Sequence, residues 1–237
     1  MKRVLLSLLI GAAALGLQAA QPTTGIKGTM HDLSATGYKT VTNVDQICVF
    51  CHTPHNAQSG AAQIIPLWNH TTTTATFTPY TLIDGTSLDY TALPGVSLAC
   101  LSCHDGTVAV GSMVNIPYGF GTGQATPLSY AGGSATSQVD KTSGLMVGTH
   151  ALGSNLSNDH PINVVYDVDM VAPSVLVTNN IPLFDASGKS QTQAYGLKVQ
   201  CASCHDVHNW GGAGITGAPF LRVNNTGSAL CLTCHIK

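Results

Sequence analysis

Apolar and polar positions follow no sustained helical or strand period after the first twenty residues. Glycine and proline, which disfavour the interior of regular elements, occur 25 and 11 times in 237 residues and interrupt almost every window. The pattern therefore predicts a chain that is mostly coil, with few secondary-structure elements, in which short helical turns carry the cysteine pairs. The best strand candidates, rich in β-branched and aromatic residues, are residues 74–83 and 163–171.

The longest apolar run lies at the beginning of the chain. Two basic residues precede an apolar stretch from Val4 to Leu17, and the small residues Ala19 and Ala20 follow it. This is the pattern of a secretory signal peptide, and the stretch is shorter than the roughly 20 residues that a membrane-spanning helix needs. The sequence predicts a signal peptide over residues 1–20, a single mature domain over residues 21–237, and no membrane span.

Charged residues make up only 8% of the chain, against about 25% in ordinary soluble domains. Removal of residues 1–20 would take away two of the nine basic residues and none of the eleven acidic ones, all of which are Asp. The remaining basic residues form no cluster, so the sequence predicts no nucleic-acid binding, which requires a basic surface against the phosphates. An uncharged polar surface also permits copies of the chain to associate.

All eight cysteines fall into four C-x-x-C pairs, and a histidine follows each second cysteine. Two thiols at this spacing can form thioethers to one haem, whose iron the adjacent imidazole can then ligate. Zinc ribbons and redox-active C-x-x-C pairs share the cysteine spacing but do not require the histidine. The sequence therefore predicts four covalently bound haem c groups, numbered 1 to 4 along the chain. The attachment residues are Cys48, Cys51, Cys100, Cys103, Cys201, Cys204, Cys231 and Cys234, and the proximal iron ligands are His52, His104, His205 and His235.

Six further histidines could supply the second axial ligand of each iron, which predicts bis-His haems. His55 and His208 each stand three residues after a proximal histidine, in the matching contexts CHTPHN and CHDVHN. Such a histidine is poorly placed for its own iron and better placed for a neighbouring haem. We therefore expect haem 1 to pair with haem 2 and haem 3 with haem 4, with His55 on haem 2 and His208 on haem 4. The candidates for haems 1 and 3 are, in order of preference, His31 and His160, then His70, then His150.

The haem-binding segments resemble the doubled C-x-x-C-H multihaem cytochromes of metal-reducing microbes. The resemblance rests on CVFCHTPHN and CASCHDVHN, with HDLS, PLWN and NDHP elsewhere in the chain. Within that group, four haems in a short exported chain are most similar to extracellular tetrahaem cytochromes whose subunits polymerise into conductive filaments, or nanowires. The resemblance implies a loop-dominated multihaem fold and a homopolymer in which the haem chain continues between subunits. It also implies that a neighbouring subunit supplies one sixth ligand, with His31 and His70 the first positions to test.

The predicted ligation favours electron transfer over catalysis, because a six-coordinate iron has no vacant position for a substrate. We expect extracellular electron transfer, with other redox proteins or extracellular acceptors as partners, at an extracellular or cell-surface location. A monomeric periplasmic shuttle is the alternative that the sequence leaves open. A multihaem reductase is less favoured, because it needs a five-coordinate haem and acid–base groups, whereas this chain has spare histidines and no Glu. Four haems would also supply the apolar interior that so irregular a sequence lacks.

Overall fold

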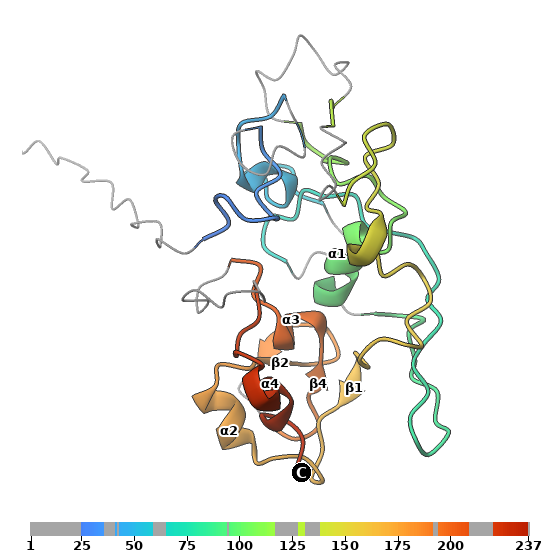
Figure 1. The fold of residues 1–237 in the computed structure, drawn as a ribbon, viewed down its shortest axis with the longest axis vertical. Coiled ribbons are helices and arrows are strands. Elements are labelled where there is room, and N and C mark those ends of the chain that lie inside the picture. The colour runs from blue at the N-terminus through green and yellow to red at the C-terminus, as the bar shows by residue number, and fades with distance from the viewer. Residues whose placement is uncertain are drawn as a thin grey trace, which may run out of the picture.

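The computed structural model describes residues 25–35, 41, 43–58, 65–93, 95–116, 128–130, 138–191, 194–208 and 220–236. The expected signal peptide, residues 1–20, lies outside these residues. The described chain is mostly coil with short helices and one small antiparallel sheet, which confirms the predicted fold class (Figure 1). Within the described ranges, no helix combines the length and the apolar composition that crossing a bilayer requires.

The helices are short because proline, glycine and polar turns end them after one to three turns. Proline opens α2 at its first turn, where the missing N–H loses no helical hydrogen bond. The helix α1, ten residues long, ends just before Gly106, whose φ of +72° suits a residue without a side chain. The described helices are α1 (Gly95–His104), α2 (Pro173–Thr178), α3 (Cys201–Cys204) and α4 (Ala229–Leu232), with 3-10 turns η1 (Cys48–Phe50), η3 (Gly148–His150) and η4 (Thr226–Ser228).

Four two-residue strands form an antiparallel sheet in the order β1-β4-β2-β3. Their bounds are β1 (Val164–Val165), β2 (Leu183–Phe184), β3 (Ser190–Gln191) and β4 (Lys198–Val199). The register pairs Val164 with Val199 and Phe184 with both Lys198 and Ser190. Of the strand expected over residues 163–171, only Val164–Val165 forms a strand, as β1.

The prediction of a strand over residues 74–83 is wrong, because this segment forms only isolated β-bridges. Thr78 bridges to Asn155, and Thr81 bridges to Ser87 across a tight turn. Pro79 lies between the two bridges and has no N–H to donate to a strand partner. Residues 74–83 therefore form no β-ladder, although their backbone is extended and several of their side chains are β-branched.

The apolar interior is divided into four small clusters, each of which touches a C-x-x-C-H motif. Cys51 packs against the cluster of Trp68 and Ala99, and Cys234 packs against the cluster around Tyr166. Phe50 and Leu101, which lie inside motifs 1 and 2, belong to the other two clusters. Because the clusters centre on the motifs, a large apolar group held there would join them into one interior.

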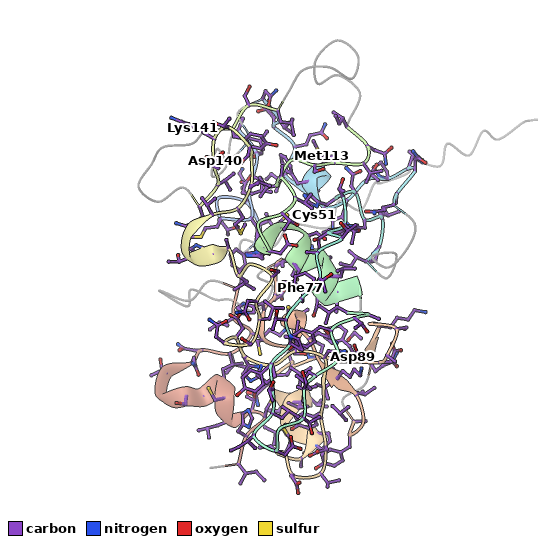
Figure 2. The ribbon with its side chains drawn as sticks, turned by 90° about the vertical axis from the view of Figure 1, so that its right-hand side faces the viewer. Cys51, Phe77, Asp89, Met113, Asp140 and Lys141 are labelled. Carbon is purple, nitrogen blue, oxygen red and sulfur yellow. The ribbon has the colours of Figure 1, made fainter. Side chains whose placement is uncertain are left out.

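The two halves of the chain meet where α1 packs against α3. Figure 1 shows α1 in the upper part of the molecule and the sheet with α2, α3 and α4 in the lower part, while the segment of residues 75–90 extends into the lower part. Figure 2 shows Cys51 and Met113 close together in the upper part, where both pack in one cluster, and Asp89 in the lower part. The second and third C-x-x-C-H motifs therefore stand on either side of this junction.

Candidate haem centres

Each C-x-x-C-H motif is built on a helical turn, as the sequence analysis expected. Motif 1 begins in η1, motif 2 is the last half of α1, motif 3 begins with α3, and motif 4 begins in α4. In three motifs the histidine N–H donates to the carbonyl of the first cysteine, over 2.8 Å for His52, 3.1 Å for His205 and 2.9 Å for His235. A helical turn brings residues three and four apart to one side, so both thiols and the imidazole of a motif can serve one ligand. All eight cysteines are free.

The four motifs follow one another in space in the same order as in the sequence. Burial, and after it the Cys51 thiol, raise the pKa of Cys103, so motifs 1 and 2 are neighbours. A hydrogen bond between the thiols of Cys100 and Cys201 raises the pKa of Cys100 and lowers that of Cys201, so motifs 2 and 3 are in contact.

Motifs 3 and 4 are also neighbours, because a thiol of motif 4 affects the pKa of a thiol of motif 3. Burial, and after it the Cys234 thiol, raise the pKa of Cys204 to about 11. The attachment thiols therefore form an unbroken succession through the molecule, from motif 1 at one end to motif 4 at the other.

Three pairs of imidazole rings have nearly the same separation. The ring centroids are 6.1 Å apart for His31 and His104, and 6.2 Å apart for the other two pairs, His52 with His208 and His160 with His235. Two imidazoles that bind one metal from opposite sides, each through a bond of about 2 Å, have centroids about 6 Å apart. The three pairs therefore have the spacing that a shared iron requires.

Several of these rings are oriented by backbone carbonyls in the way that metal ligands usually are. The Nδ1 atom lies 2.7 Å from the Pro66 carbonyl in His52, 2.9 Å from the His150 carbonyl in His104, and 3.0 Å from the Pro161 carbonyl in His160. A hydrogen bond at Nδ1 fixes the tautomer and leaves Nε2 with a lone pair for a metal. These three histidines are therefore prepared to bind iron through Nε2.

His70 is placed differently from the other candidates, because both of its ring nitrogens contact protein atoms. Its side chain is buried, with Nδ1 2.8 Å from the Thr71 carbonyl and Nε2 3.0 Å from the Ala109 carbonyl. Nε2 also lies 3.5 Å from the Cys103 sulfur. Burial lowers the pKa of His70, and the hydrogen bonds oppose that shift. In this arrangement His70 connects the segment around Thr71 to the end of α1, and its role as an iron ligand stays a prediction.

The assignment of His55 to haem 2 and of His208 to haem 4 stays a prediction, and the ring pairs in the structure favour other partners. The rings beside His104 and His235 belong to His31 and His160, while His208 lies beside His52. His208 follows His205 by three residues and is therefore poorly placed to bind the iron that His205 would bind. Contacts between residues far apart in the sequence determine which other imidazole His208 faces. One such contact is the bond of 2.7 Å from the Asp206 N–H to the Phe220 carbonyl.

All ten histidines lie among the described residues, and four of them have no imidazole partner at the ligand spacing: His70, described above, and His55, His150 and His205. His205 pairs through its backbone with Leu221, and no second imidazole stands opposite its ring at about 6 Å. His55 is exposed and, with His52, lines a cavity of about 370 Å³ beside motif 1. His150 is also exposed. Motif 3 thus differs from the other three motifs.

Sequence reasoning missed several polar residues that hold the motifs in place. Asn69, fully buried, donates from Nδ2 to the carbonyl of Val49 inside motif 1, over 2.6 Å. Arg222 donates from Nε to the carbonyl of Ala202 inside motif 3, over 2.8 Å, and its guanidinium lies 3.6 Å from the Asp206 carboxylate. Single polar residues outside any repeated motif carry no periodic signal, so only the fold identifies them.

The described residues fit a covalently bound haem. Two buried nitrogens, Nδ1 of His31 and Nε1 of Trp68, have no hydrogen-bond partner, which is rare in a complete structure. His31 faces His104, and Trp68 packs against Cys51, so both atoms lie where a macrocycle would be attached. Free thiols, paired imidazoles and a divided apolar interior point to the same group.

Comparison with known proteins supports this conclusion for the C-terminal part of the chain. Residues 196–237, which contain motifs 3 and 4, match the doubled CXXCH motif family. Comparison with curated proteins finds no match. With eight cysteines in four C-x-x-C pairs, each followed by histidine, the chain has the attachment sites for up to four haem c groups. Four such motifs are typical of multihaem c-type cytochromes, whose chemistry is electron transfer, and the family match covers the last two of the four.

Proposed function

We propose that this cytochrome carries electrons outside the cytoplasm through four bis-His haems, as a subunit of a polymeric cytochrome filament. The observation that carries the relay is that each C-x-x-C-H motif neighbours the next, with Cys51 packed on the cluster that includes Ala99 of α1, and α1 packed on α3, an arrangement that would place four haems in one succession. When bound, haem c supplies an iron that alternates between the ferric and ferrous states. The protein holds the distances and adjusts the potentials through ligands, hydrogen bonds and charge.

The imidazole pairs suggest which residues bind each iron. In this assignment His52 and His208 serve haem 1, His104 and His31 serve haem 2, and His235 and His160 serve haem 4. The common separation of about 6 Å and the Nδ1 hydrogen bonds of three of these rings support it.

Haem 3 would be held by Cys201, Cys204 and His205, with its sixth ligand supplied by a neighbouring copy of the chain. His55 and His150 are the candidates on that copy, since both are exposed and belong to no pair. An intersubunit ligand of this kind would join the haem succession of one subunit to that of the next. Few charges on the surface favour such association, because they offer little repulsion between copies.

A reductase is the second candidate function, and motif 3 is the observation that favours it. If no second copy binds, haem 3 would have His205 as its one imidazole ligand, and Asp206 and Arg222 beside motif 3 would offer an acid and a cation for a proton or an anion. A monomeric periplasmic shuttle requires all four irons to be six-coordinate within one chain. The state of haem 3 therefore separates the three functions.

The experiment is electron cryo-microscopy of the protein secreted by cells that express it, together with its mass and its electron paramagnetic resonance spectrum. We expect a mature chain lacking residues 1–20 with the added mass of four haems, only low-spin ferric signals, and filaments with continuous haem contacts. Monomers with low-spin signals would support the shuttle instead, and a high-spin signal would support the reductase. A mass without added haem would contradict electron transfer itself.

A further inference from the structure

The contact between motifs 2 and 3 connects the two halves of the molecule. Motif 2 lies on α1 and motif 3 on α3, and these helices pack against each other (Figure 1). The thiols of Cys100 and Cys201 shift each other's pKa, so haems attached to them would be neighbours. An electron that moves from haem 2 to haem 3 would cross here.

A buried polar network joins the two helices beside those thiols. The Ser97 hydroxyl of α1 donates to Oε1 of Gln200, the residue before α3, over 2.5 Å. The same hydroxyl accepts the N–H of Cys201 over 3.2 Å. Both side chains are at most 1% exposed, so water does not compete for these bonds.

Gln200 makes further hydrogen bonds through its backbone N–H and its side-chain amide. Its backbone N–H donates to the Ser203 hydroxyl over 3.0 Å, which forms a capping box at the start of α3. Its Nε2 donates to Oδ1 of Asn163 over 3.2 Å, and Nδ2 of Asn163 donates to the Asp89 carbonyl over 2.9 Å. The network therefore connects α1, α3, the start of the sheet and the loop at Asp89, the last of which Figure 2 labels.

We propose that the Ser97–Gln200 hydrogen bond sets the separation and relative orientation of haems 2 and 3, and so controls electron passage between the two halves of the chain. Ser97 and Gln200 are positioning residues, because they touch no iron ligand and act through the helices that carry the thiols. This inference rests on the proposed electron relay. Hydrogen bonds fix distance and direction more narrowly than apolar contacts do, and the rate of electron tunnelling decreases exponentially with distance.

The chain offers a matched control for this proposal. Ser102 lies on the same helix and is also fully buried, but its hydroxyl donates to the Leu98 carbonyl over 2.7 Å and accepts the Thr73 N–H over 3.0 Å. Ser102→Ala therefore removes an equally buried hydroxyl on the side of α1 that does not face α3. Both serine variants should lower stability to a similar extent, by loss of buried hydrogen bonds.

The experiment compares the fully loaded Ser97→Ala, Ser102→Ala and unchanged proteins by circular dichroism in the Soret region and by transient absorption after photoreduction. The Soret couplet reports the distance and angle between neighbouring haems, and transient absorption reports how fast an electron spreads among them. We expect Ser97→Ala to lose more couplet amplitude and to slow redistribution more than Ser102→Ala does, because the Ser102 hydroxyl, although it lies within motif 2, bonds to Leu98 and Thr73 and not to α3. The Gln200→Asn variant, which shortens the side chain by one methylene, should behave like Ser97→Ala. It replaces Ser97→Ala in the comparison if the Ser97→Ala protein does not accumulate in cells.

Equal spectra and rates in Ser97→Ala and the unchanged protein would overturn the proposal, as would equal changes in the two serine variants. Haem content and reversible reduction of the unchanged protein are measured first. Failure there contradicts the proposed function, whereas normal loading and reduction with an unaffected couplet in Ser97→Ala contradicts only the role of the Ser97–Gln200 bond.

Discussion

Asn69 provides a direct test of how motif 1 is held. Its side chain is fully buried and makes three hydrogen bonds, from Nδ2 to the carbonyls of Val49 (2.6 Å) and Asn115 (2.9 Å), and from the Asn115 N–H to Oδ1 (2.8 Å). The Asn69→Ala substitution leaves two carbonyls and one N–H in a partly buried region without these partners. Each lost bond costs about 1 kcal/mol, and the sum is about 2–4 kcal/mol of unfolding free energy.

Thermal unfolding of the fully loaded protein, followed by circular dichroism, measures this cost. For a chain of this size a loss of about 2–4 kcal/mol corresponds to a Tm lower by about 5–15 °C. Asn158→Ala is the control, since Asn158 is exposed and the change should stay within about 0.5 kcal/mol of the unchanged protein. A Tm for Asn69→Ala equal to that of Asn158→Ala would refute the view that Asn69 connects motif 1 to the segment around Asn115.

Three further predictions concern ligation, potential and pH. His160→Ala should produce a high-spin ferric signal, because it removes a proposed ligand, while His70→Ala should lower stability and keep the low-spin spectrum; the opposite result would exchange their roles. Arg222→Gln should lower one of the haem midpoint potentials in a redox titration, since removal of a cation beside motif 3 favours the ferric form. Burial raises the pKa of Tyr166 to about 12, so the unfolded chain ionises first and stability should fall as pH rises from about 10 to about 12; unfolding curves of Tyr166→Phe should lack that decrease.

Much of the chemistry could be predicted from the sequence, because covalent attachment is local. A C-x-x-C-H motif places two thiols and an imidazole on one helical turn, and each motif does lie on such a turn. The irregular fold follows from the frequency of glycine and proline. The β-ladder expected over residues 74–83 is absent because Pro79 has no N–H to donate. Strand propensities averaged over a window of residues do not reveal this effect of a single proline.

Interactions between distant parts of the chain could not be predicted in this way. Ser97 and Gln200 are 103 residues apart, and neither belongs to a repeated pattern. The proximity of His208 to His52 likewise depends on how the chain turns after motif 3, and not on spacing within the motif. His70 could not be separated from the other spare histidines, because only the fold shows that both of its nitrogens contact backbone carbonyls.

The touching thiols of Cys100 and Cys201 have a consequence for how the protein must be made. A chain that adopted this fold before receiving its prosthetic groups would hold two sulfhydryls from different motifs against each other, and an oxidising compartment would convert them into a cystine. That bond would occupy one sulfur of each motif and block two attachment sites at once. If the chain is exported to such a compartment, attachment of haem to a reduced and still open polypeptide would avoid this cystine.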